Sequence, residues 1–473
     1  MTARPASMKT RIVSGEKQTP FGLARKFGAK VILESSSASR GRERYSILLI
    51  EEAFRLRQEG PSVIFRKGPE RRVLPNPDIL DAMEELAALH EGTSTEVPFP
   101  AGGIGYLTFE FVSFCDAAMD LPDRPDPLGL PLAEYLFGRL YIVFDHDTHL
   151  LHLMAVDYGD VEGSHSSLPN LDDILNTAEA RIGDFDFNYM MESSETYTAI
   201  VASSLKEKEE YKAAVRFIRG ETVKGNLFQG VPSRRLEITT QMPAIEAYRI
   251  LRSRNPSPYQ FYLDFGDYQF FGTSPEMHVK VAGGRVSLRP IAGTRRRGIN
   301  EAEDRELAAE LLADEKERAE HLMLVDLGRN DLGRICEVGS VEVTEMMAVE
   351  KYSAVMHIVS RVEGNLAADK TPADAVRATF PAGTVSGAPK IQAVKTLSRL
   401  ENVPRSFYAG LVGYLEPGGN LDSCIAIRCA LKRENRLFLQ AGAGVVYDSD
   451  PQRELEETSE KLQALANAAG VEV

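Results

Sequence analysis

Short apolar runs alternate with turns over the first 150 residues of the chain. The runs that are richest in β-branched and aromatic residues lie at 31–33, 45–50, 104–107 and 140–144. Their period of two is typical of antiparallel strands with one buried face. Between them, the residues from Asp78 to His90 predict a helix with Asp78 as its N-cap.

A second region begins near Tyr197 and mixes helices with strands without a regular βαβ rhythm. Helices are predicted over 206–220, over 301–312, from Asp314 to Leu327, and from Asp450-Pro451 to a point before Gly470. Strands are predicted over 226–231, 260–265, 268–272 and 278–281. Gly328 is expected to end the third of these helices. This mixture favours an α+β fold over a doubly wound parallel sheet.

The same patterns divide the chain into four parts. Residues 1–20 are expected to form a loose arm, residues 21–158 an N-terminal subdomain, residues 159–195 a linker region and residues 196–473 a second domain. The linker is placed where Gly, Ser and Asp become frequent.

Composition narrows the class of protein. The chain has 473 residues, of which 43% are hydrophobic and 26% charged, as in soluble globular proteins. Its net charge of −14 disfavours nucleic acid and anionic membranes as partners. No apolar run approaches the roughly 20 residues of a membrane span, and the basic N-terminus lacks an apolar signal core, so a cytoplasmic protein is expected. The four cysteines lack CxxC spacing, which predicts free thiols and no glutaminase nucleophile.

Two pairs of glutamates, Glu317/Glu320 and Glu454/Glu457, are each spaced i, i+3 within a predicted helix. This spacing places both carboxylates of a pair on one helix face. Two such faces suggest a hard cation such as Mg²⁺, which takes oxygen ligands and is commonly completed by a substrate anion. Solvated surface charge is the default alternative, and Glu317 alone also fits a capping box that begins at Asp314.

Further candidate side chains lie in apolar surroundings. His357 lies in the apolar run 355–359, where a buried structural histidine is the more common explanation and a catalytic one requires a cleft. Arg428 lies in the strand-like run 424–430, where an arginine needs a carboxylate from the protein or from a ligand. Lys461 continues the stripe of the second glutamate pair one turn further on.

Three glycine-rich or basic segments have weaker signals. Residues 383–390 fail the GxxxxGK[ST] spacing of a phosphate loop, and residues 442–444 lack the third glycine of a dinucleotide site. Both segments can still offer backbone N–H groups to a carboxylate. The basic cluster 295–297 is expected to be a solvated loop.

A series of short motifs that occur in a fixed order along the chain connects these candidate residues to one family. The segments are 32–35 (ILES), 44–46 (RYS), 228–234 (FQGVPSR), 255–259 (NPSPY), 274–276 (SPE), 290–294 (PIAGT), 326–331 (DLGRND), 380–384 (FPAGT) and 440–444 (QAGAG). Together they span almost the whole chain, which resembles the chorismate-utilising enzymes and, among these, the large subunits of anthranilate synthase.

The resemblance implies a large antiparallel β-sandwich flanked by helices, with the active site in its cleft. It implies conversion of chorismate and ammonia to anthranilate and pyruvate, the first step of tryptophan biosynthesis. The four glutamates would hold Mg²⁺ against the ring carboxylate of chorismate. The substrate site would include Tyr408, Arg428, Lys461, the amides near Gly442 and Gly444, and the block Ala292, Gly293 and Thr294. Glu276 would protonate the departing C4 hydroxyl, His357 would assist the loss of pyruvate, and Thr384 would line the pocket.

Two positions separate the members of this family. Relatives that add water carry a lysine base at the position of Gln229, and a glutamine cannot act as that base. Relatives that aminate C4 often carry a nucleophilic lysine at the position of Ala292. Ammonia at C2 is therefore favoured. The alternatives are a 2-amino-2-deoxyisochorismate synthase, which keeps its pyruvate, an aminodeoxychorismate synthase, and a catalytically inactive tryptophan-binding subunit.

The resemblance also implies regulation and a partner. Ammonia would come from a separate glutamine amidotransferase subunit, so a hetero-oligomer is expected. The N-terminal subdomain would be regulatory and residues 196–473 catalytic. The tryptophan feedback pocket would be formed by Leu33, Glu34, Ser35, Arg44, Pro258, Tyr259, Val412 and Tyr414. Gln260 stands where methionine is common in such pockets.

Overall fold

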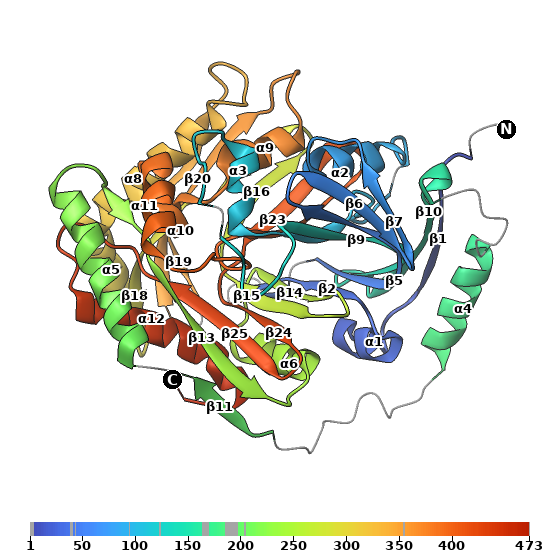
Figure 1. Cartoon of the computed structure of the whole chain (residues 1–473). Helices are drawn as coiled ribbons and strands as arrows, with labels where there is room; N and C mark the ends of the chain where they lie inside the picture. Colours follow the sequence, from blue (N-terminus) through green and yellow to red (C-terminus); the bar gives the residue numbers. More distant parts are fainter. Residues whose placement is uncertain are drawn as a thin grey trace.

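The computed structural model describes most of the chain in one body of strands and helices (Figure 1). The described residues are 4–37, 41–42, 44–93, 95–122, 124–162, 170–184, 197–202, 205–352 and 355–472. The strands before residue 160 are β1 (Ser7–Ser14), β2 (Val31–Glu34), β3 (Ser36–Ser37), β4 (Gly41–Arg42), β5 (Tyr45–Glu59), β6 (Ser62–Lys67), β7 (Glu70–Leu74), β8 (Ile104–Leu107), β9 (Ala133–Asp145) and β10 (Leu150–Asp157).

The remaining strands lie in the C-terminal region. They are β11 (Ala199–Ala202), β12 (Gln229–Gly230), β13 (Ser233–Thr240), β14 (Tyr259–Asp264), β15 (Gln269–Ser274), β16 (Met277–Ala282), β17 (Arg285–Leu288), β18 (Ile291–Arg296), β19 (Glu342–Lys351), β20 (Val355–Asn365), β21 (Gly387–Ala388), β22 (Leu411–Leu415), β23 (Leu421–Ile425), β24 (Cys429–Arg433) and β25 (Arg436–Gly442).

The helices cover the outer surfaces of these strands. The α-helices are α1 (Pro20–Phe27), α2 (Ile79–Ala88), α3 (Val112–Cys115), α4 (Leu171–Gly183), α5 (Leu205–Val223), α6 (Ala244–Arg254), α7 (Glu301–Ala313), α8 (Glu315–Leu332), α9 (Pro372–Thr379), α10 (Gly383–Ser386), α11 (Lys390–Leu400) and α12 (Pro451–Ala466). The 3₁₀ turns are η1 (Phe109–Phe111), η2 (Gly159–Glu162), η4 (Pro417–Gly419) and η5 (Asn467–Ala469).

Hydrogen bonds link 21 of the described strands into one antiparallel sheet that joins the two halves of the chain. β2 pairs with both β5 and β14, and β8 pairs with both β9 and β22. In Figure 1 the N-terminal strands β5, β6, β7, β9 and β10 lie on one side of the molecule and α5, α8, α11 and α12 on the other, with β14, β15, β16 and β23 between them. The α+β prediction is confirmed. Both regions contribute strands to this sheet. Their division into two subdomains stays a prediction.

The period-two pattern places alternate residues of each strand in two different cores. On β5, Ile47 and Leu49 pack into the larger core between the strands, whereas Leu48 packs into the second core. On β15, Phe270 and Phe271 divide in the same way. The second core lies under α1, α4, α6 and α12, which cover that face of the sheet. The apolar alternation in the sequence therefore produces a layered sandwich flanked by helices.

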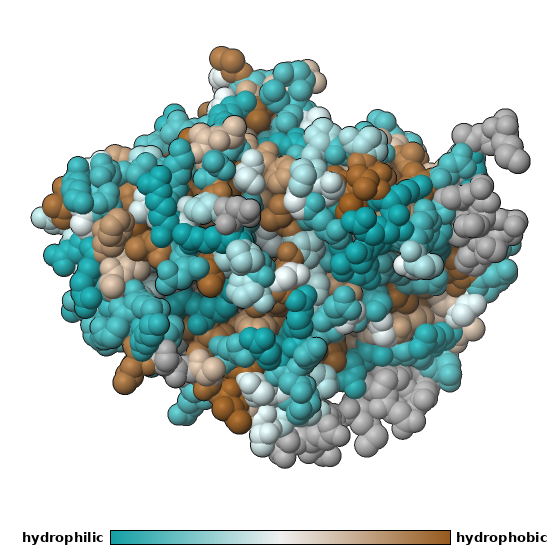
Figure 2. Space-filling model, viewed as in Figure 1, coloured by the Kyte–Doolittle hydropathy of each residue, from teal (hydrophilic) through white to brown (hydrophobic). Residues whose placement is uncertain are grey.

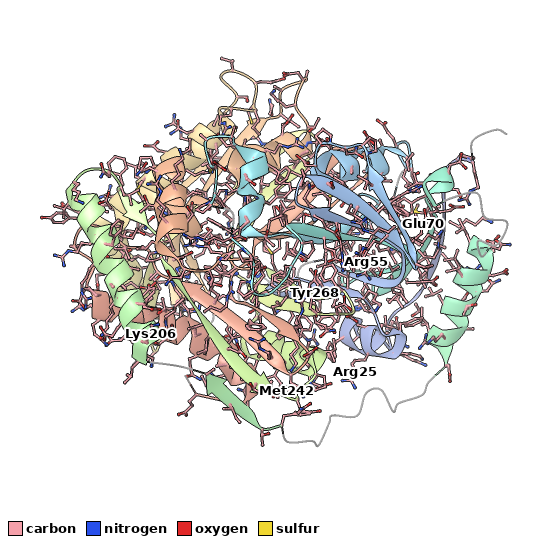
Figure 3. All side chains as sticks on the ribbon, in the orientation of Figure 1. Arg25, Arg55, Glu70, Lys206, Met242 and Tyr268 are labelled. Atoms are coloured by element: carbon pink, nitrogen blue, oxygen red, sulfur yellow. The ribbon has the colours of Figure 1, made fainter. Side chains whose placement is uncertain are left out.

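A buried carboxylate connects the two halves within the larger core. Glu134 on β9 has no exposed surface and accepts hydrogen bonds from Arg55, Arg57 and the hydroxyl of Tyr268. Figure 3 labels Arg55 and Tyr268, which come from opposite halves of the chain. A buried charge is tolerated when its partners satisfy it, so this network fixes how the halves meet.

Helix caps follow the sequence closely, with one exception. Asp78 accepts from the backbone N–H groups of Leu80 and Asp81 at the start of α2, as predicted. Asp450 caps α12 in the same way, with Pro451 at the first helical position. The predicted stop at Gly328 is wrong, because α8 continues to Leu332. Residues Leu324, Val325 and Leu332 are buried on the sheet side of α8, and this packing outweighs the poor helix propensity of one glycine.

Other predicted segments also need correction. Residues 7–14 of the expected loose arm form β1, which pairs with β10 over its full length. Within the expected linker, η2 and α4 are ordered, and residues 163–169 and 185–196 lie outside the described part. The strand predicted over 226–231 is only the two-residue β12. The basic cluster 295–297 is not a free loop, since Arg295 and Arg296 end β18.

The surface and the cysteines agree with the composition. Figure 2 shows a face on which hydrophilic residues predominate and hydrophobic ones form small scattered groups. Within the described ranges, none of the helices combines the length and apolar character needed to cross a bilayer. All four cysteines are free thiols, and Cys336, Cys424 and Cys429 are buried.

Candidate active site and a second pocket

The two predicted acidic faces lie on α8 and α12, and they face one another closely enough to interact. Burial raises the pKa of Glu320, and the charges of Glu317 and Glu457 raise it further. Burial likewise raises the pKa of Glu454, to which Glu457 on the same helix also contributes. Glu320 and Glu457, which are 137 positions apart in the chain, therefore share one electrostatic environment.

The contacts of these glutamates test the alternative interpretations. Asp314 caps α8 by accepting from the N–H groups of Lys316 and Glu317, but the Glu317 carboxylate accepts from Arg295 Nη1 at 3.1 Å. Glu317 thus makes an ion pair that the cluster prediction for residues 295–297 missed. Glu457 pairs with Lys461 at 2.7 Å, one turn along α12.

The carboxylate oxygens of these glutamates are of the kind that a divalent cation takes as ligands, although the described residues form no preformed cage. Among the described residues, no group of three or more His, Cys, Asp or Glu side chains has the arrangement of a metal site. Mg²⁺ usually takes only one or two protein carboxylates and completes its shell with water and substrate oxygens. The raised pKa values of Glu320 and Glu454 arise partly from neighbouring negative charge, which a bound cation would relieve.

Gln229 connects the acidic pair on α8 to the glycine-rich turn after β25. Its Nε2 donates to Glu320 Oε1 at 2.7 Å, whereas its buried Oε1 has no partner among the described residues. A Cβ on Gly444 would lie 2.6 Å from Gln229 Nε2, so only glycine allows this approach. The backbone bridge between Gly230 and Val445 holds the two segments together.

Glu276 is a buried carboxyl at the start of β16. It is 9% exposed, and burial raises its pKa to about 7, an effect that Thr384 and the Lys461 ammonium oppose. The Thr384 hydroxyl is close enough to favour the ionised form, yet its buried Oγ1 has no hydrogen-bond partner of ordinary geometry in the described structure. A carboxylic acid that retains its proton near neutral pH suits a general acid.

His357 lies on β20 opposite Thr294 of β18. Its Nδ1 lies 3.0 Å from the carbonyl oxygen of Gly293, and a carbonyl can only accept, so Nδ1 carries the proton. Burial lowers the pKa of His357, which leaves Nε2 as an unprotonated acceptor at neutral pH. Gly293 occupies a β-bulge with φ of 68°, where other residues would be strained. Ala292 precedes this bulge.

The predicted carboxylate-binding groups are brought together beside the glutamates. Arg428 lies between β23 and β24 with φ of 51°, so the continuous strand predicted over 424–430 is wrong. The Arg428 guanidinium makes no hydrogen bond or ion pair with any described residue, and burial lowers its pKa while Tyr408 and Glu457 oppose this. Lys461 donates to the carbonyl of Gly442 at 2.8 Å. A partly buried cation in a strained backbone conformation without a partner is typical of an anion site.

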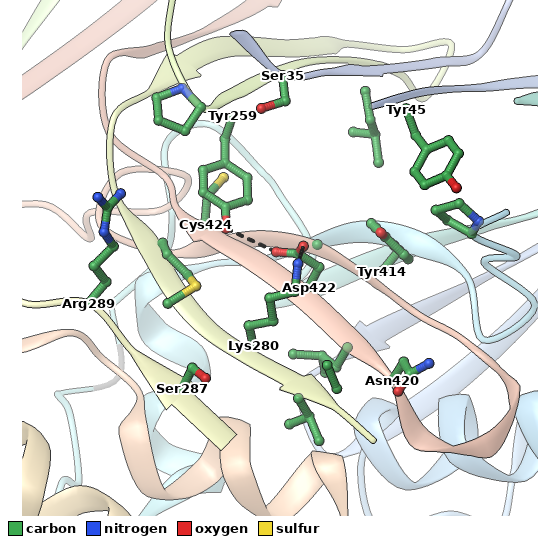
Figure 4. Close-up of a pocket in the computed structure, with 18 of the residues that line it drawn as sticks. Ser35, Tyr45, Tyr259, Lys280, Ser287, Arg289, Tyr414, Asn420, Asp422 and Cys424 are labelled. Atoms are coloured by element: carbon green, nitrogen blue, oxygen red, sulfur yellow. Dashed lines mark hydrogen bonds and ion pairs between the residues drawn. The ribbon is translucent and has the colours of Figure 1, made fainter. Parts of the chain in front are cut away.

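All eight residues predicted to form the tryptophan feedback pocket line one cavity of about 820 Å³. Figure 4 shows this pocket, with Ser35, Tyr45, Tyr259 and Tyr414 around it. Sequence reasoning missed Lys280 and Asp422 on its wall. Tyr259 donates to Asp422 at 3.0 Å, as the dashed line in Figure 4 marks, and Lys280 pairs with Asp422 at 2.8 Å. The only available signal was strand alternation on β16 and β23.

Two of the predicted pocket residues already have protein partners. The Glu34 carboxylate pairs with Arg252 at 2.5 Å and accepts from the Tyr248 hydroxyl at 2.9 Å. Arg44 pairs with Asp145 at 3.0 Å. Glu34 and Arg44 can therefore contact a ligand in the pocket only while they remain paired with Arg252 and Asp145, respectively.

The two cavities lie next to one another at the start of β16. Pro275 lines the larger cavity, whereas Glu276 and His278 line a smaller one of about 50 Å³. Met277 and Arg289 line both cavities. Glu276 therefore lies between two residues, Pro275 and Met277, that contribute to the wall of the larger pocket.

Comparison with known proteins places this geometry in a family. The chorismate binding enzyme model matches residues 30–467. The chain therefore belongs to the chorismate binding enzymes.

Within that family it is similar to proteins named anthranilate synthase component 1. One from Spirochaeta aurantia is 55% identical over 98% of this chain and 95% of its own length. One from Acetivibrio thermocellus is 37% identical over 97% of this chain and 94% of its own length. The crystal structure of anthranilate synthase component I from Streptococcus pneumoniae TIGR4 superposes with a TM-score of 0.78 at 36% identity, over 89% of this chain and 92% of that one.

Proposed function

We propose that this chain is the chorismate-converting subunit of an anthranilate synthase, which turns chorismate and ammonia into anthranilate and pyruvate with Mg²⁺. The observation that carries the proposal is Glu276, a buried carboxylic acid with a pKa of about 7 that faces Thr384 and Lys461. The similarity to proteins named anthranilate synthase component 1 over nearly the whole chain supports the same reaction.

Chorismate carries two carboxylates, and the site offers several groups to bind them. Arg428 has no partner among the described residues, and Lys461 uses two of its three N–H donors on Glu457 and the Gly442 carbonyl. We assign these cations, the Tyr408 hydroxyl and the amides near Gly442 and Gly444 to the substrate carboxylates. Mg²⁺ held by Glu317, Glu320, Glu454 and Glu457 would supply charge neutralisation and polarisation at the ring carboxylate.

Glu276 acts in the first chemical step. The nitrogen lone pair of ammonia forms the bond to C2 of the ring, and the C4–O bond breaks with its electron pair leaving on oxygen. Hydroxide is a poor leaving group, so Glu276 donates its proton and the oxygen departs as water. The new ammonium group releases one proton to solvent, and the Glu276 carboxylate must take one up before the next turnover.

His357 acts in the second step. The ring loses the proton at C2, and the bond between ring C3 and the enolpyruvyl oxygen breaks with its electron pair leaving on oxygen. This yields the aromatic ring and the enolate of pyruvate, which takes up one proton at its methylene carbon to become pyruvate. The neutral His357 has a free Nε2 because Nδ1 donates to the Gly293 carbonyl. We assign this nitrogen to the proton transfer in that step.

Two uncharged residues select this reaction over the family alternatives. Gln229 cannot remove a proton from water, and its Nε2 donates to Glu320. Ala292 offers no nucleophile for a covalent intermediate. Ammonia at C2 is the outcome that both favour, with a glutamine amidotransferase subunit as its source. Tryptophan is proposed as the ligand of the 820 Å³ pocket, as a feedback inhibitor.

One assay tests the central proposal. The purified chain is mixed with chorismate, MgCl₂ and an ammonium salt, anthranilate is followed by its fluorescence and pyruvate by a coupled dehydrogenase. Both products should form in equal amounts and only when ammonium is present. An amino product that retains its enolpyruvyl group would indicate a 2-amino-2-deoxyisochorismate synthase, and 4-amino product would indicate C4 amination. Tryptophan binding without any turnover would indicate a regulatory subunit.

A further inference from the structure

The cavity beside Glu276 has a mixed apolar and polar lining and room for water. Its volume is about 50 Å³, and it lies between β16 and the helices α8 and α10. A site needs only roughly 10–15 Å³ to hold one water molecule, provided that polar groups are within reach. The polar residues among those that line it are Glu276, His278, Arg289, Asp331, Thr379 and Thr384.

His278 is the least satisfied of these groups. The residue is 4% exposed, and neither ring nitrogen has a partner of ordinary hydrogen-bond geometry in the described ranges, although the Thr379 carbonyl is close enough to raise the pKa of the ring. The ring packs edge-on against Phe380, with 5.7 Å between the ring centroids. The buried Thr384 Oγ1 likewise lacks a partner of ordinary geometry among the described residues, although it lies close to Glu276. Buried polar atoms are rarely left unpaired in folded proteins, so these three atoms point to ordered water in the cavity.

The charges around His278 keep it neutral. Lys390 is buried next to it and donates to Asp331 at 2.7 Å and to the Thr379 carbonyl at 2.8 Å. Burial and the Lys390 ammonium lower the pKa of His278 to about 3, although the Thr379 carbonyl opposes this. A neutral imidazole has one donor and one acceptor nitrogen, so it can hold two water molecules without itself taking up a proton.

We propose that this cavity contains a short water chain, positioned by His278 and Thr384, through which Glu276 recovers its proton after each turnover. The inference rests on the proposed function, since it concerns the acid that protonates the C4 hydroxyl. The balance is simple: Glu276 loses one proton to the departing oxygen, and a cavity water transfers one proton to the resulting carboxylate. Solvent re-protonates that water, having received a proton from the new ammonium group. His278 is a positioning residue in this scheme.

The resting enzyme provides a sharp test below the pKa of about 7, because most of its Glu276 then carries a proton before the first turnover. A blocked water chain should leave the first turnover intact and slow only the later ones. His278→Phe removes both nitrogens and fills the cavity, and His278→Gln is the conservative variant that keeps a donor and an acceptor. Gly328→Ala reduces the cavity from the α8 side: its Cβ would lie 3.4 Å from Leu288 and 3.8 Å from Pro290, ordinary contacts for a residue with better helix propensity.

The measurement is rapid-mixing fluorescence with chorismate, MgCl₂ and ammonium, in excess over enzyme and then below it. For His278→Phe we expect a first turnover at the wild-type rate, an unchanged KM and a kcat that is lower by roughly tenfold. This loss is part of the roughly 10²–10⁴-fold rate increase that a positioned general acid contributes. His278→Gln should restore most of kcat, and Gly328→Ala should give an intermediate kcat with the same first turnover. If His278→Phe does not fold, Gly328→Ala carries the test.

Three results would overturn the inference. Equal slowing of the first and later turnovers would mean a structural defect at the acid, and wild-type kcat in both His278→Phe and Gly328→Ala would mean that the cavity has no role. A failure of His278→Gln to recover kcat would exclude water positioning by this side chain. A wild-type chain that forms no anthranilate would instead refute the proposed function, and the inference with it.

Discussion

The side-chain amide of Gln229 donates to Glu320 Oε1 at 2.7 Å, which joins the residue proposed to select the nucleophile to a candidate metal ligand. The contact bridges β12 and α8, 91 positions apart in the chain. It fixes the orientation of the amide, with Nε2 toward the carboxylate and the unpaired Oε1 left for another donor. An ammonia molecule, which donates three hydrogen bonds, suits that free oxygen, whereas a water-activating base is absent from this position.

Gln229→Glu should replace the hydrogen bond to Glu320 with repulsion between two carboxylates. Two carboxylates at this distance cannot both ionise freely, so one of them is protonated near neutral pH and the binding of Mg²⁺ weakens. We expect at least a roughly tenfold rise in the Mg²⁺ concentration for half-maximal turnover, equivalent to one pKa unit. The check is anthranilate formation against MgCl₂ concentration, with the exposed α11 residue Gln392→Glu as control. Identical Mg²⁺ curves for Gln229→Glu and wild type would contradict the assignment.

Removal of a proposed ligand should have a related effect. Glu320→Gln keeps the size of the side chain and can still bond to Gln229, but it loses the charge that a cation needs. Turnover should fall by about 10–100-fold at millimolar Mg²⁺, as for altered metal sites generally, and EDTA should abolish the activity of the wild type. Glu315→Gln, exposed in the first turn of the same helix, is the matched control. Full activity of Glu320→Gln at limiting Mg²⁺ would remove Glu320 from the ligand set.

Local signals in the sequence predicted local structure well. The Asp78 cap and the Asp450-Pro451 start need only neighbouring residues, and both form as expected. The pairing of β1 with β10 depends on partners that are 136 to 150 positions away, from Ser14↔Leu150 to Ser7↔Asp157. The continuation of α8 through Gly328 depends on packing against the rest of the fold. Neither was accessible from short stretches of sequence. Such tertiary effects regularly override propensity.

The candidate site divides in the same way. Arg428 and the four glutamates could be found from spacing and from their apolar or helical surroundings, whereas Glu276 was found only through the family resemblance. The properties of these residues could not be predicted from the sequence. The pKa of Glu276 is raised because distant segments bury it, and the lack of a hydrogen-bond partner for the Arg428 guanidinium among the described residues is known only from the three-dimensional structure. His278 carried no signal at all, because an unpaired buried histidine is recognisable only once its neighbours are known.

The acid role of Glu276 predicts a pH dependence. The group must be protonated to donate, so kcat should decline as the pH rises through its pKa of about 7. Glu276→Gln, which is isosteric but cannot donate a proton to the leaving oxygen, should lower kcat by roughly 10²–10⁴ with little change in KM. The exposed α12 residue Glu456→Gln is the control. A pH profile for the wild type that stays flat between pH 6 and 8 would argue against this acid.

The same pKa makes a separate prediction for stability. Glu276 has a folded-state pKa of about 7 against an ordinary value of 4.5, so between these values the folded state binds more protons than the unfolded state. The free energy of unfolding therefore falls as the pH rises from about 4.5 to 7, by up to ~3 kcal/mol from this group. Glu276→Gln removes this slope and should be more stable than wild type at pH 8. Urea denaturation at pH 5 and pH 8 measures both, and equal pH dependence in the two proteins would refute the shift.

The larger pocket should control inhibition without supplying catalysis. Ser35→Arg places a long side chain in the cavity shown in Figure 4, so tryptophan should inhibit at least about tenfold more weakly while uninhibited turnover is retained. Ser113→Arg on the exposed face of α3 is the control. Titration of turnover with tryptophan measures the effect. Inhibition of Ser35→Arg at the wild-type concentration would place the inhibitor elsewhere.

Arg428 should illustrate a conflict between stability and binding. Its partly buried guanidinium has no partner in the described structure, and its φ of 51° is a left-handed conformation that costs a non-glycine residue about 1–2 kcal/mol. Arg428→Gln should leave the stability of the ligand-free protein unchanged or higher while chorismate binding weakens by about 2–5 kcal/mol, the range for truncating one member of a buried charge pair. Arg428→Gly should add the relief of backbone strain.

Glu434→Gly is the matched control. Glu434 has a φ of 50° in the turn between β24 and β25, so this variant should gain stability in the same way without loss of chorismate binding. Thermal denaturation without ligand and calorimetric titration with chorismate separate the two effects. If Arg428→Gln were strongly destabilised in the absence of ligand, the arginine would have a structural role, and the assignment of this cation to the substrate carboxylate would fail.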